Sequence, residues 1–224
     1  MATPSQARLR AFVREHTRLV AVPGLPGLRI HTGADVMALC QQAGELLGQA
    51  DPDLPYWAFP WAGGLAVAHH LAVHPDEVAG GSVLDLAAGS GLCGIAAVRA
   101  GATAVEAVDV DPLAGAAVWL NARANGVRLG FIGRDLLDEA PPLVDVILAG
   151  DVCYQAGMAG RILPWLRRAA SAGTRVLLGD PGRAHLPGDL EAIATYDVQT
   201  SRELETAGLT PVSVYALGAP GIRR

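Results

Sequence analysis

Short apolar runs and helical patterns alternate along most of this chain. From residue 82 onward, buried strands are indicated by SVLDLAA, AVEAVDV, RLGFIG, VDVILAG and RVLLGD. Helices are indicated by GLCGIAAVRAG, PLAGAAVWLNARANG and GMAGRILPWLRRAASAG. This alternation predicts parallel strands joined by right-handed crossovers. The expected fold class is therefore α/β, with a Rossmann-like doubly wound sheet.

The C-terminal runs EAIATYDVQT and TPVSVYALG differ, because no full helical pattern separates them. They predict two further strands, which bring the sheet to seven and close it with an antiparallel edge.

The first 55 residues carry another pattern. Five apolar residues and a histidine fall at helical spacing in the first twenty residues: Leu9, Phe12, Val13, His16, Leu19 and Val20. VPGLPG then predicts a turn, LRIHT an extended piece, and residues 35–47 an amphipathic helix. This part is too small to fold alone. We therefore expect an N-terminal extension, residues 1–55, packed on a main domain of residues 56–224.

Composition and charge narrow the classes of partner. The 224 residues carry a formal net charge of −5, which gives no reason to expect a nucleic-acid surface. No apolar segment approaches the length of a membrane span, and the first twenty residues lack the uncharged core of a signal peptide. We expect a cytoplasmic, monomeric protein with no membrane partner.

Cysteine and histidine spacing suggests no metal. Cys40, Cys93 and Cys153 show no Cys-x-x-Cys spacing, so neither a disulfide framework nor a zinc site is indicated, and buried thiols are expected. His70 and His74 lie four apart on an expected helix, but no third ligand follows nearby.

We look for ligand-binding residues just after each strand, because ligands of open sheets bind beyond the carboxyl ends of the strands. After the first strand, Gly89, Gly91 and Gly94 form a G-x-G-x-x-G, which both dinucleotide and adenosyl cofactors use. Asp85 lies four residues earlier. Its charge would repel a pyrophosphate but suits the cationic methionine moiety of S-adenosyl-L-methionine. The alternative is that Asp85 only hydrogen-bonds the loop backbone.

Two more acids follow the next strands. Asp109, twenty residues past Gly89, is placed to accept hydrogen bonds from both ribose hydroxyls. Asp111 and Pro112 favour a helix start with Asp111 as the N-cap. Asp135 is assigned to the adenine amino group, the alternative being a solvated loop acid.

The segment PYWAFPWAGG places Tyr56, Trp57, Phe59 and Trp61 within six residues. Its prolines exclude a regular helical face, and Gly-Gly predicts a turn. The rings serve as a hydrophobic plug, as the wall of a cofactor and substrate cleft, or as both. Trp57 is assigned to the cofactor, because an indole offers a hydrogen-bond donor and a face for a cation.

Together, PYWAFPWAGG, VLDLAAGSGLCGIAA, AVDVDP, AGDVCY and GDPGR resemble the seven-strand protein lysine methyltransferases. The resemblance is closest to the electron transfer flavoprotein beta-subunit lysine methyltransferases and their bacterial relatives, and it runs from the N-terminal helix to the last strand. It implies S-adenosyl-L-methionine as cofactor and the electron transfer flavoprotein beta subunit as protein substrate. The chain departs from the pattern at Ala87, Ala88 and Cys153.

The resemblance also implies catalytic residues. In that family an acid-x-x-aromatic motif lies beside the methyl group, and Asp151 and Tyr154 match it. Asp151 would aim the lysine amine, and Tyr154 would wall its channel. The alternative for this pair is a strand-end cap and a packed tyrosine. Gly150 is added to the cofactor-binding set.

The loop after the fifth strand, GDPGR, opens on the same side of the sheet. Asp180 and Arg183 are assigned to substrate binding together with Trp61, with Arg183 anchoring the loop or an acidic group. A simple Asp-Pro-Gly turn is the alternative.

Rival functions remain open. One is a methyltransferase acting on another protein, for example a ribosomal protein. A small-molecule methyltransferase would carry an inserted lid, which the sequence does not show. A non-catalytic adenosyl-binding interaction protein is disfavoured by the intact acidic set, and a nicotinamide dehydrogenase is the weakest reading.

Overall fold

A seven-stranded sheet forms the centre of the molecule, in the order β5-β4-β3-β6-β7-β9-β8. The computed structural model describes residues 4–200 and 208–218. Neighbouring strands from β5 to β7 are parallel, whereas β9 runs antiparallel to both β7 and β8. The strands are β3 (Ser82–Leu86), β4 (Ala104–Val108), β5 (Gly130–Ile132), β6 (Val146–Gly150), β7 (Arg175–Asp180), β8 (Ala192–Thr200) and β9 (Gly208–Leu217). The predicted fold class and antiparallel edge are confirmed.

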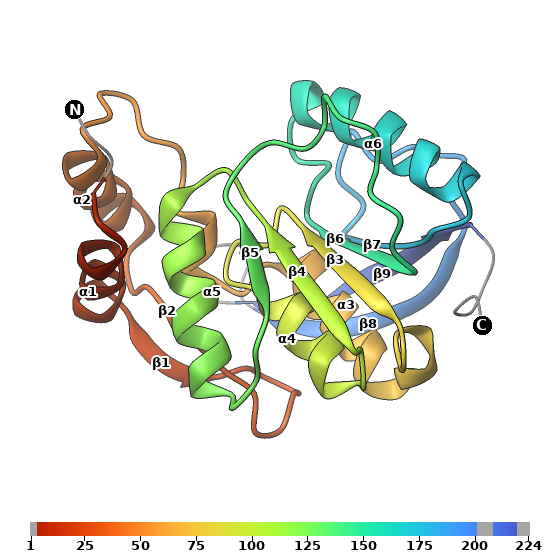
Figure 1. Ribbon diagram of the computed structural model, residues 1–224, viewed down its shortest axis with the longest axis horizontal. Coiled ribbons are helices and arrows are strands. Elements are labelled where there is room, and N and C mark those ends of the chain that lie inside the picture. The colour runs from red at the N-terminus through yellow and green to blue at the C-terminus, as the bar shows by residue number, and fades with distance from the viewer. Residues whose placement is uncertain (1–3, 201–207, 219–224) are drawn as a thin grey trace.

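Helices cover both faces of this sheet, with α6 on one face and α3 and α4 on the other (Figure 1). Alternate residues of β6 point to opposite faces: Ile147 packs in the core under α6, and Leu148 packs with α3 and α4. The helices are α1 (Gln6–His16), α2 (Val36–Leu47), α3 (Ala62–Val73), α4 (Leu92–Arg99), α5 (Pro112–Ala124) and α6 (Ala156–Ser171), with single turns η1 (Tyr56–Ala58) and η2 (Pro75–Glu77).

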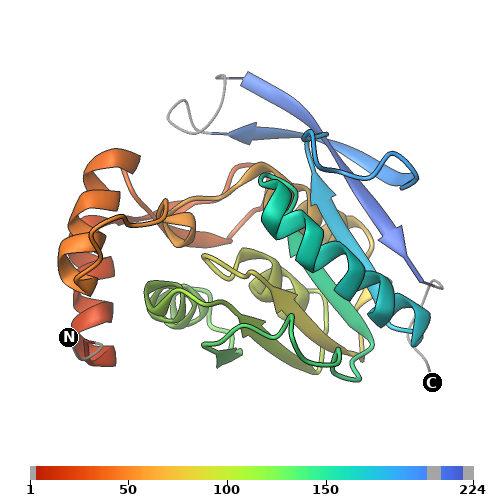
Figure 2. The same cartoon turned by 90° about the horizontal axis from the view of Figure 1, so that it is seen from above.

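The N-terminal helices lie at one end of the molecule, beyond α5 as seen from the sheet (Figures 1 and 2). Leu9 and Val13 of α1 are completely buried in a third core, which also contains Leu113 of α5 and Trp57 of η1. This packing joins the first helix to the aromatic segment and so to the edge of the candidate site.

The structure corrects the end of the first helix. Leu19 and Val20 lie not on α1 but on strand β1 (Arg18–Ala21), where both are partly exposed. Strand β1 pairs antiparallel with β2 (Arg29–Thr32), which corresponds to the predicted extended piece. Pairing across the VPGLPG turn satisfies the backbone groups that a longer helix would have bonded internally.

The Gly-Gly pair in PYWAFPWAGG is also corrected. Gly63 and Gly64 form no turn but lie in the first turn of α3. A side chain on Gly63 would collide with the Gly179 carbonyl of β7, and one on Gly150 would lie 2.6 Å from the Gly64 nitrogen. The glycines therefore permit close contact between a helix and two strand ends.

The cysteines and the histidine pair that the sequence analysis considered as metal ligands can now be located. All three cysteines are free and buried, as expected. His70 is buried with its Nδ1 3.0 Å from the Tyr196 hydroxyl and its Nε2 3.7 Å from Glu77. Within the described ranges no group of three or more His, Cys, Asp or Glu side chains is arranged to hold a metal ion. None of the helices described there has the length and apolarity needed to cross a bilayer.

Candidate active site

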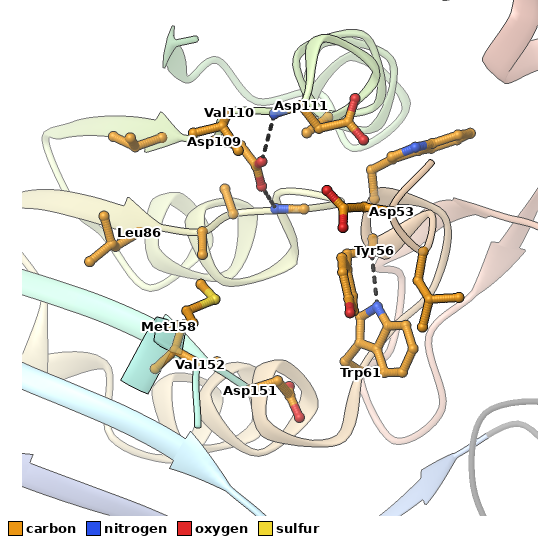
Figure 3. A pocket seen from close by; sticks show the side chains of 18 of the residues that line it. Asp53, Tyr56, Trp61, Leu86, Asp109, Val110, Asp111, Asp151, Val152 and Met158 are labelled. Carbon is orange, nitrogen blue, oxygen red and sulfur yellow. Dashed lines mark hydrogen bonds between the residues drawn. The ribbon is translucent and has the colours of Figure 1, made fainter. Parts of the chain in front are cut away.

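A cavity of about 820 Å³ opens beyond the carboxyl ends of β3, β4 and β6 (Figure 3). Its walls come from the glycine loop after β3, the aromatic segment, the N-terminal part of α6 and the loop after β7. Its volume is typical of sites that take a cofactor-sized molecule. Ten of the twelve residues assigned from the sequence line this one cavity; Gly91 and Asp180 do not.

The glycine loop runs from β3 into α4 with an unusual backbone. Gly89 (φ 50°) and Gly91 (φ 76°) adopt left-handed conformations that favour glycine, and so does the non-glycine Ala87 (φ 55°). A side chain on Gly89 would lie 3.2 Å from the carbonyl oxygen of Tyr56. The loop is thus held open to a ligand while the aromatic segment packs across it.

Asp85 is buried under this loop. Its Oδ2 accepts a hydrogen bond of 2.8 Å from the Gly94 nitrogen in α4. Burial raises the pKa of Asp85 to about 7, the Gly94 hydrogen bond opposes the rise, and the charge of Asp109 adds to it. Asp85 therefore supports the loop backbone and also offers a carboxyl group to the cavity.

Asp109 follows β4 and faces the glycine loop (Figure 3). Its Oδ2 accepts from the Gly89 nitrogen at 2.8 Å and its Oδ1 from the Asp111 nitrogen at 3.0 Å. Burial raises its pKa, and these backbone hydrogen bonds oppose the rise. Each oxygen keeps acceptor capacity for a ligand hydroxyl. Asp111 caps α5 through the Leu113 nitrogen, as predicted.

Asp135 borders the cavity from an exposed position after β5. Its carboxylate accepts from the Leu137 nitrogen at 2.8 Å and pairs with Arg161 of α6 at 2.8 Å. These contacts hold the pKa of Asp135 below its usual value, with the Leu137 hydrogen bond as the largest cause. Asp135 is thus a fixed acceptor at the rim.

The aromatic segment contributes two different tryptophans. Trp57 is 1% exposed, and its indole nitrogen has no hydrogen-bond partner among the residues that the structure describes. Trp61 instead donates to the Tyr56 carbonyl at 2.9 Å, and its ring lies tilted against the Tyr56 ring, with 5.4 Å between centroids. The Tyr56 ring lies 5.1 Å from that of Tyr154. Three rings therefore form a continuous wall.

Asp151 lies just past β6 with a left-handed backbone (φ 60°). Its Oδ2 accepts from the Gly64 nitrogen in the first turn of α3 at 2.8 Å, and its Oδ1 accepts from Arg183 Nη1 at 2.6 Å. Burial raises the pKa of Asp151, while Arg183 and the N–H groups of α3 oppose the rise. Burial also raises the pKa of the Tyr154 hydroxyl, and Tyr56 adds to that rise.

The GDPGR loop turns back toward Asp151. Asp180 Oδ1 accepts from the Gly182 and Arg183 nitrogens at 2.8 and 2.7 Å, and the Asp180 side chain is completely buried. The loop therefore has the Asp-Pro-Gly turn that was the alternative to a substrate-binding role, and Arg183 is directed at an acidic group, Asp151. Asp180 shapes the turn from inside and presents no surface to a partner in this structure.

Sequence reasoning missed two contributors, the Gly64 N–H group and Arg161. Tyr56 was named as one ring of the aromatic segment, but it was given no role of its own. Gly64 and Arg161 carried no signal in the sequence, because each matters only through a contact with a residue far along the chain.

The residues present fit S-adenosyl-L-methionine. Positive-φ glycines leave room for a close approach of the ligand, and Asp109 offers paired acceptors to a diol. Trp57 lines the cavity with a buried N–H donor that lacks a partner within the described chain. Such a donor is costly to bury unless a ligand or water satisfies it.

Comparison with known proteins places the chain in a family. Residues 71–153 match the family described as Ribosomal protein L11 methyltransferase (PrmA). Electron transfer flavoprotein beta subunit lysine methyltransferase of Xenopus laevis is 37% identical, covering 92% of this chain and 86% of that protein. The Homo sapiens protein of the same name is 32% identical, covering 92% and 81%.

A solved structure supports the fold. A proposed RNA methyltransferase from Pyrococcus horikoshii superimposes with a TM-score of 0.57 at 17% identity, covering 81% of this chain and 97% of that one. These similarities confirm a methyltransferase that uses S-adenosyl-L-methionine. The chain belongs to the family of electron transfer flavoprotein beta subunit lysine methyltransferases.

Proposed function

We propose that this chain methylates lysine side chains of the electron transfer flavoprotein beta subunit. One observation carries the proposal: Asp151 and the ring wall of Tyr56, Trp61 and Tyr154 border the same cavity as Asp109 and the glycine loop. A methyl donor and an amine can therefore meet there. The relatives that match over most of the chain carry that substrate in their names.

On the cofactor side, Gly89 and Gly91 cradle the ligand and Asp109 accepts from the ribose hydroxyls. Asp85 faces the cationic methionine moiety, and Trp57 donates its free indole N–H. Two further residues, Asp135 and Gly150, complete the cofactor set, Asp135 at the adenine amino group and Gly150 beside the methionine end. When bound, S-adenosyl-L-methionine supplies a methyl group on a positively charged sulfur.

On the lysine side, the protein must present a neutral amine. A lysine amine has a reference pKa of about 10.4, so deprotonating it at pH 7 costs roughly 4 to 5 kcal/mol. Asp151 accepts a hydrogen bond from the incoming nitrogen and directs its lone pair, and the excess proton leaves to water. Tyr154, with Tyr56 and Trp61, walls the channel and attracts the cationic head before it loses its proton.

The substrate protein meets the rim of the cavity. Trp61 and the loop that holds Asp180 and Arg183 lie at this rim, with Asp180 acting through the loop backbone. We include in the proposal that the enzyme is a monomer and that it does not bind nucleic acid. The net charge of −5 supports the second of these points.

A ribosomal protein is the second candidate substrate, because residues 71–153 match the L11 methyltransferase family. That match covers the part of the chain that holds the glycine loop and Asp109. The longer match to the flavoprotein-methylating relatives favours the beta subunit.

The deciding experiment incubates the purified chain with methyl-labelled S-adenosyl-L-methionine and purified electron transfer flavoprotein, with ribosomal protein L11 and a protein-free metabolite extract in parallel. We expect label on lysines of the beta subunit, located by mass spectrometry, and less label by about a hundredfold or more with Asp151→Asn. Label only on L11, only in small molecules, or nowhere despite cofactor binding would each reject the proposal.

A further inference from the structure

Three hydrogen bonds fix Asp151, one through its backbone and two through its carboxylate. Its backbone nitrogen donates to the Gly179 carbonyl at 2.9 Å, fixing the left-handed conformation that a non-glycine residue rarely adopts. Gly64 of α3 binds one carboxylate oxygen and Arg183 binds the other. The Asp151 side chain is 12% exposed, so water contributes little to stabilising its charge.

Arg183 is itself fixed by the loop that carries it. Its backbone nitrogen donates to Asp180 Oδ1 at 2.7 Å, and its Nη1 lies 3.6 Å from Asp180 Oδ2. The Arg183 side chain is 20% exposed and that of Asp180 is completely buried. One guanidinium therefore stands between a structural carboxylate and the carboxylate at the reacting centre.

We propose that Arg183 is a positioning residue, which keeps the Asp151 carboxylate charged and aimed at the lysine amine, and so couples the GDPGR loop to methyl transfer. The inference rests on the proposed function and assigns Arg183 a role beyond contact with the substrate protein. Because Arg183 and Gly64 each occupy one site per oxygen, acceptor capacity remains on both for the amine.

Removing the guanidinium leaves a buried carboxylate whose charge is stabilised, among the described residues, by the α3 N–H groups alone. The neutral form is then favoured, since desolvation disfavours a buried charge. A neutral carboxyl group attracts an amine less, and its proton can point at the substrate nitrogen in place of an acceptor lone pair. Catalysis that needs the charged form must then fail progressively as the pH falls.

Other titratable groups near Asp151 also bear on any pH dependence assigned to it. Among the described residues, the thiols of Cys93 and Cys153 interact with Asp151, and the Asp180 carboxylate lies beside Arg183 and Cys153. Burial raises the pKa of Cys93 well above its usual value and that of Cys153 to about 11. Both thiols therefore stay neutral between pH 6 and 9, where the test is made.

The test measures methylation of the flavoprotein beta subunit by wild type, Arg183→Met and Arg183→Lys from pH 6 to 9. Each variant rate is divided by the wild-type rate, so deprotonation of the substrate lysine cancels. We expect the Arg183→Met ratio to fall at least tenfold from pH 9 to pH 6, the Arg183→Lys ratio to fall less, and cofactor affinity to stay level.

The matched control is Arg167→Met. Arg167 of α6 pairs with Asp189 at 2.9 Å, so it ties the same loop region to the domain without touching Asp151. Its ratio should be flat. The inference is overturned if the rate ratio of Arg183→Met does not change with pH, or if that of Arg167→Met changes equally. Arg183 would then only anchor the loop.

A second readout needs no activity. The carboxyl carbon signal of Asp151 in ¹³C-labelled protein, identified by its loss in Asp151→Asn, should titrate at higher pH in Arg183→Met than in wild type. An unchanged titration rejects the role of Arg183 even if another substrate is found. A wild type that titrates as expected but does not methylate the beta subunit rejects only the proposed function.

Discussion

The first turn of α3 lies directly on the end of β7, where Gly63 and Gly179 face each other with no room for a side chain on either. This contact brings the N–H groups of α3 to the carboxylate of Asp151. The active-site geometry therefore depends on two glycines that take no part in the reaction.

Replacing Gly63 with alanine should lower stability. The added methyl group meets backbone, which cannot rotate away, and overpacking of this kind costs about 1–3 kcal/mol. In a protein of this size we expect Tm to fall by about 2–4 °C per kcal/mol, measured by calorimetry. Gly160→Ala in α6 is the control, because nothing lies within 4 Å of the new methyl group; its Tm should hold or rise. A stable Gly63→Ala would contradict the close contact.

Asp109→Ala should weaken binding of S-adenosyl-L-methionine at least tenfold, since buried hydroxyls would lose their acceptor and Gly89 its partner. Isothermal calorimetry measures the affinity, and circular dichroism checks the fold. Asp76→Ala, at an exposed position in η2, should bind normally. Unchanged affinity in folded Asp109→Ala would remove this residue from the site.

Asp151→Asn separates chemistry from cofactor binding. The amide can still accept from Gly64 but loses its charge, so methylation should fall by about two orders of magnitude or more while cofactor affinity changes little. Tyr154→Phe should be milder, because its ring face survives. Near-normal turnover of Asp151→Asn, or joint loss of binding and activity, would make this residue structural.

Tyr56 is predicted to act on the protein substrate alone. Its ring joins Trp61 to Tyr154, so Tyr56→Ala should raise KM for the beta subunit about fivefold, as loss of a cation–π contact of roughly 1 kcal/mol gives. Tyr56→Phe should keep a nearly normal KM. Equal effects of the two substitutions would point to the hydroxyl group instead.

Asp85 should make the ligand-free protein less stable as the pH rises. Its folded pKa of about 7 lies above the ordinary 3.8, so the stabilisation from protonated Asp85 is complete below about pH 4 and is lost by about pH 7. Asp85→Asn keeps a neutral acceptor for Gly94. The difference in unfolding free energy, Asp85→Asn minus wild type, should therefore increase from pH 4 to pH 7 and stay constant above pH 7. Asp138→Asn, at an exposed side chain, should track wild type; parallel curves for Asp85→Asn would refute the shift.

Much of this protein followed from local pattern. Alternating apolar runs predicted the seven strands, and the antiparallel edge followed from two strands without a full helical pattern between them. Asp85, Asp109 and Asp151 could be selected because each belongs to or directly follows a strand, and parallel strands end at one edge of a sheet. Periodicity and strand ends are properties of neighbouring residues, so the chain reveals them directly.

The tertiary structure decided what local pattern could not. Leu19 and Val20 fit a helical spacing, yet pairing with β2 places them in a strand. The sequence predicted a turn at Gly63 and Gly64, yet both residues lie in the first turn of α3, where they pack against the ends of β6 and β7. Asp151 meets partners 87 and 32 residues away, Gly64 and Arg183, and those contacts set its charge and direction. Such contacts arise only when distant elements pack. Asp151 could therefore be predicted from the sequence, whereas its partners Gly64 and Arg183 could be identified only in the folded structure.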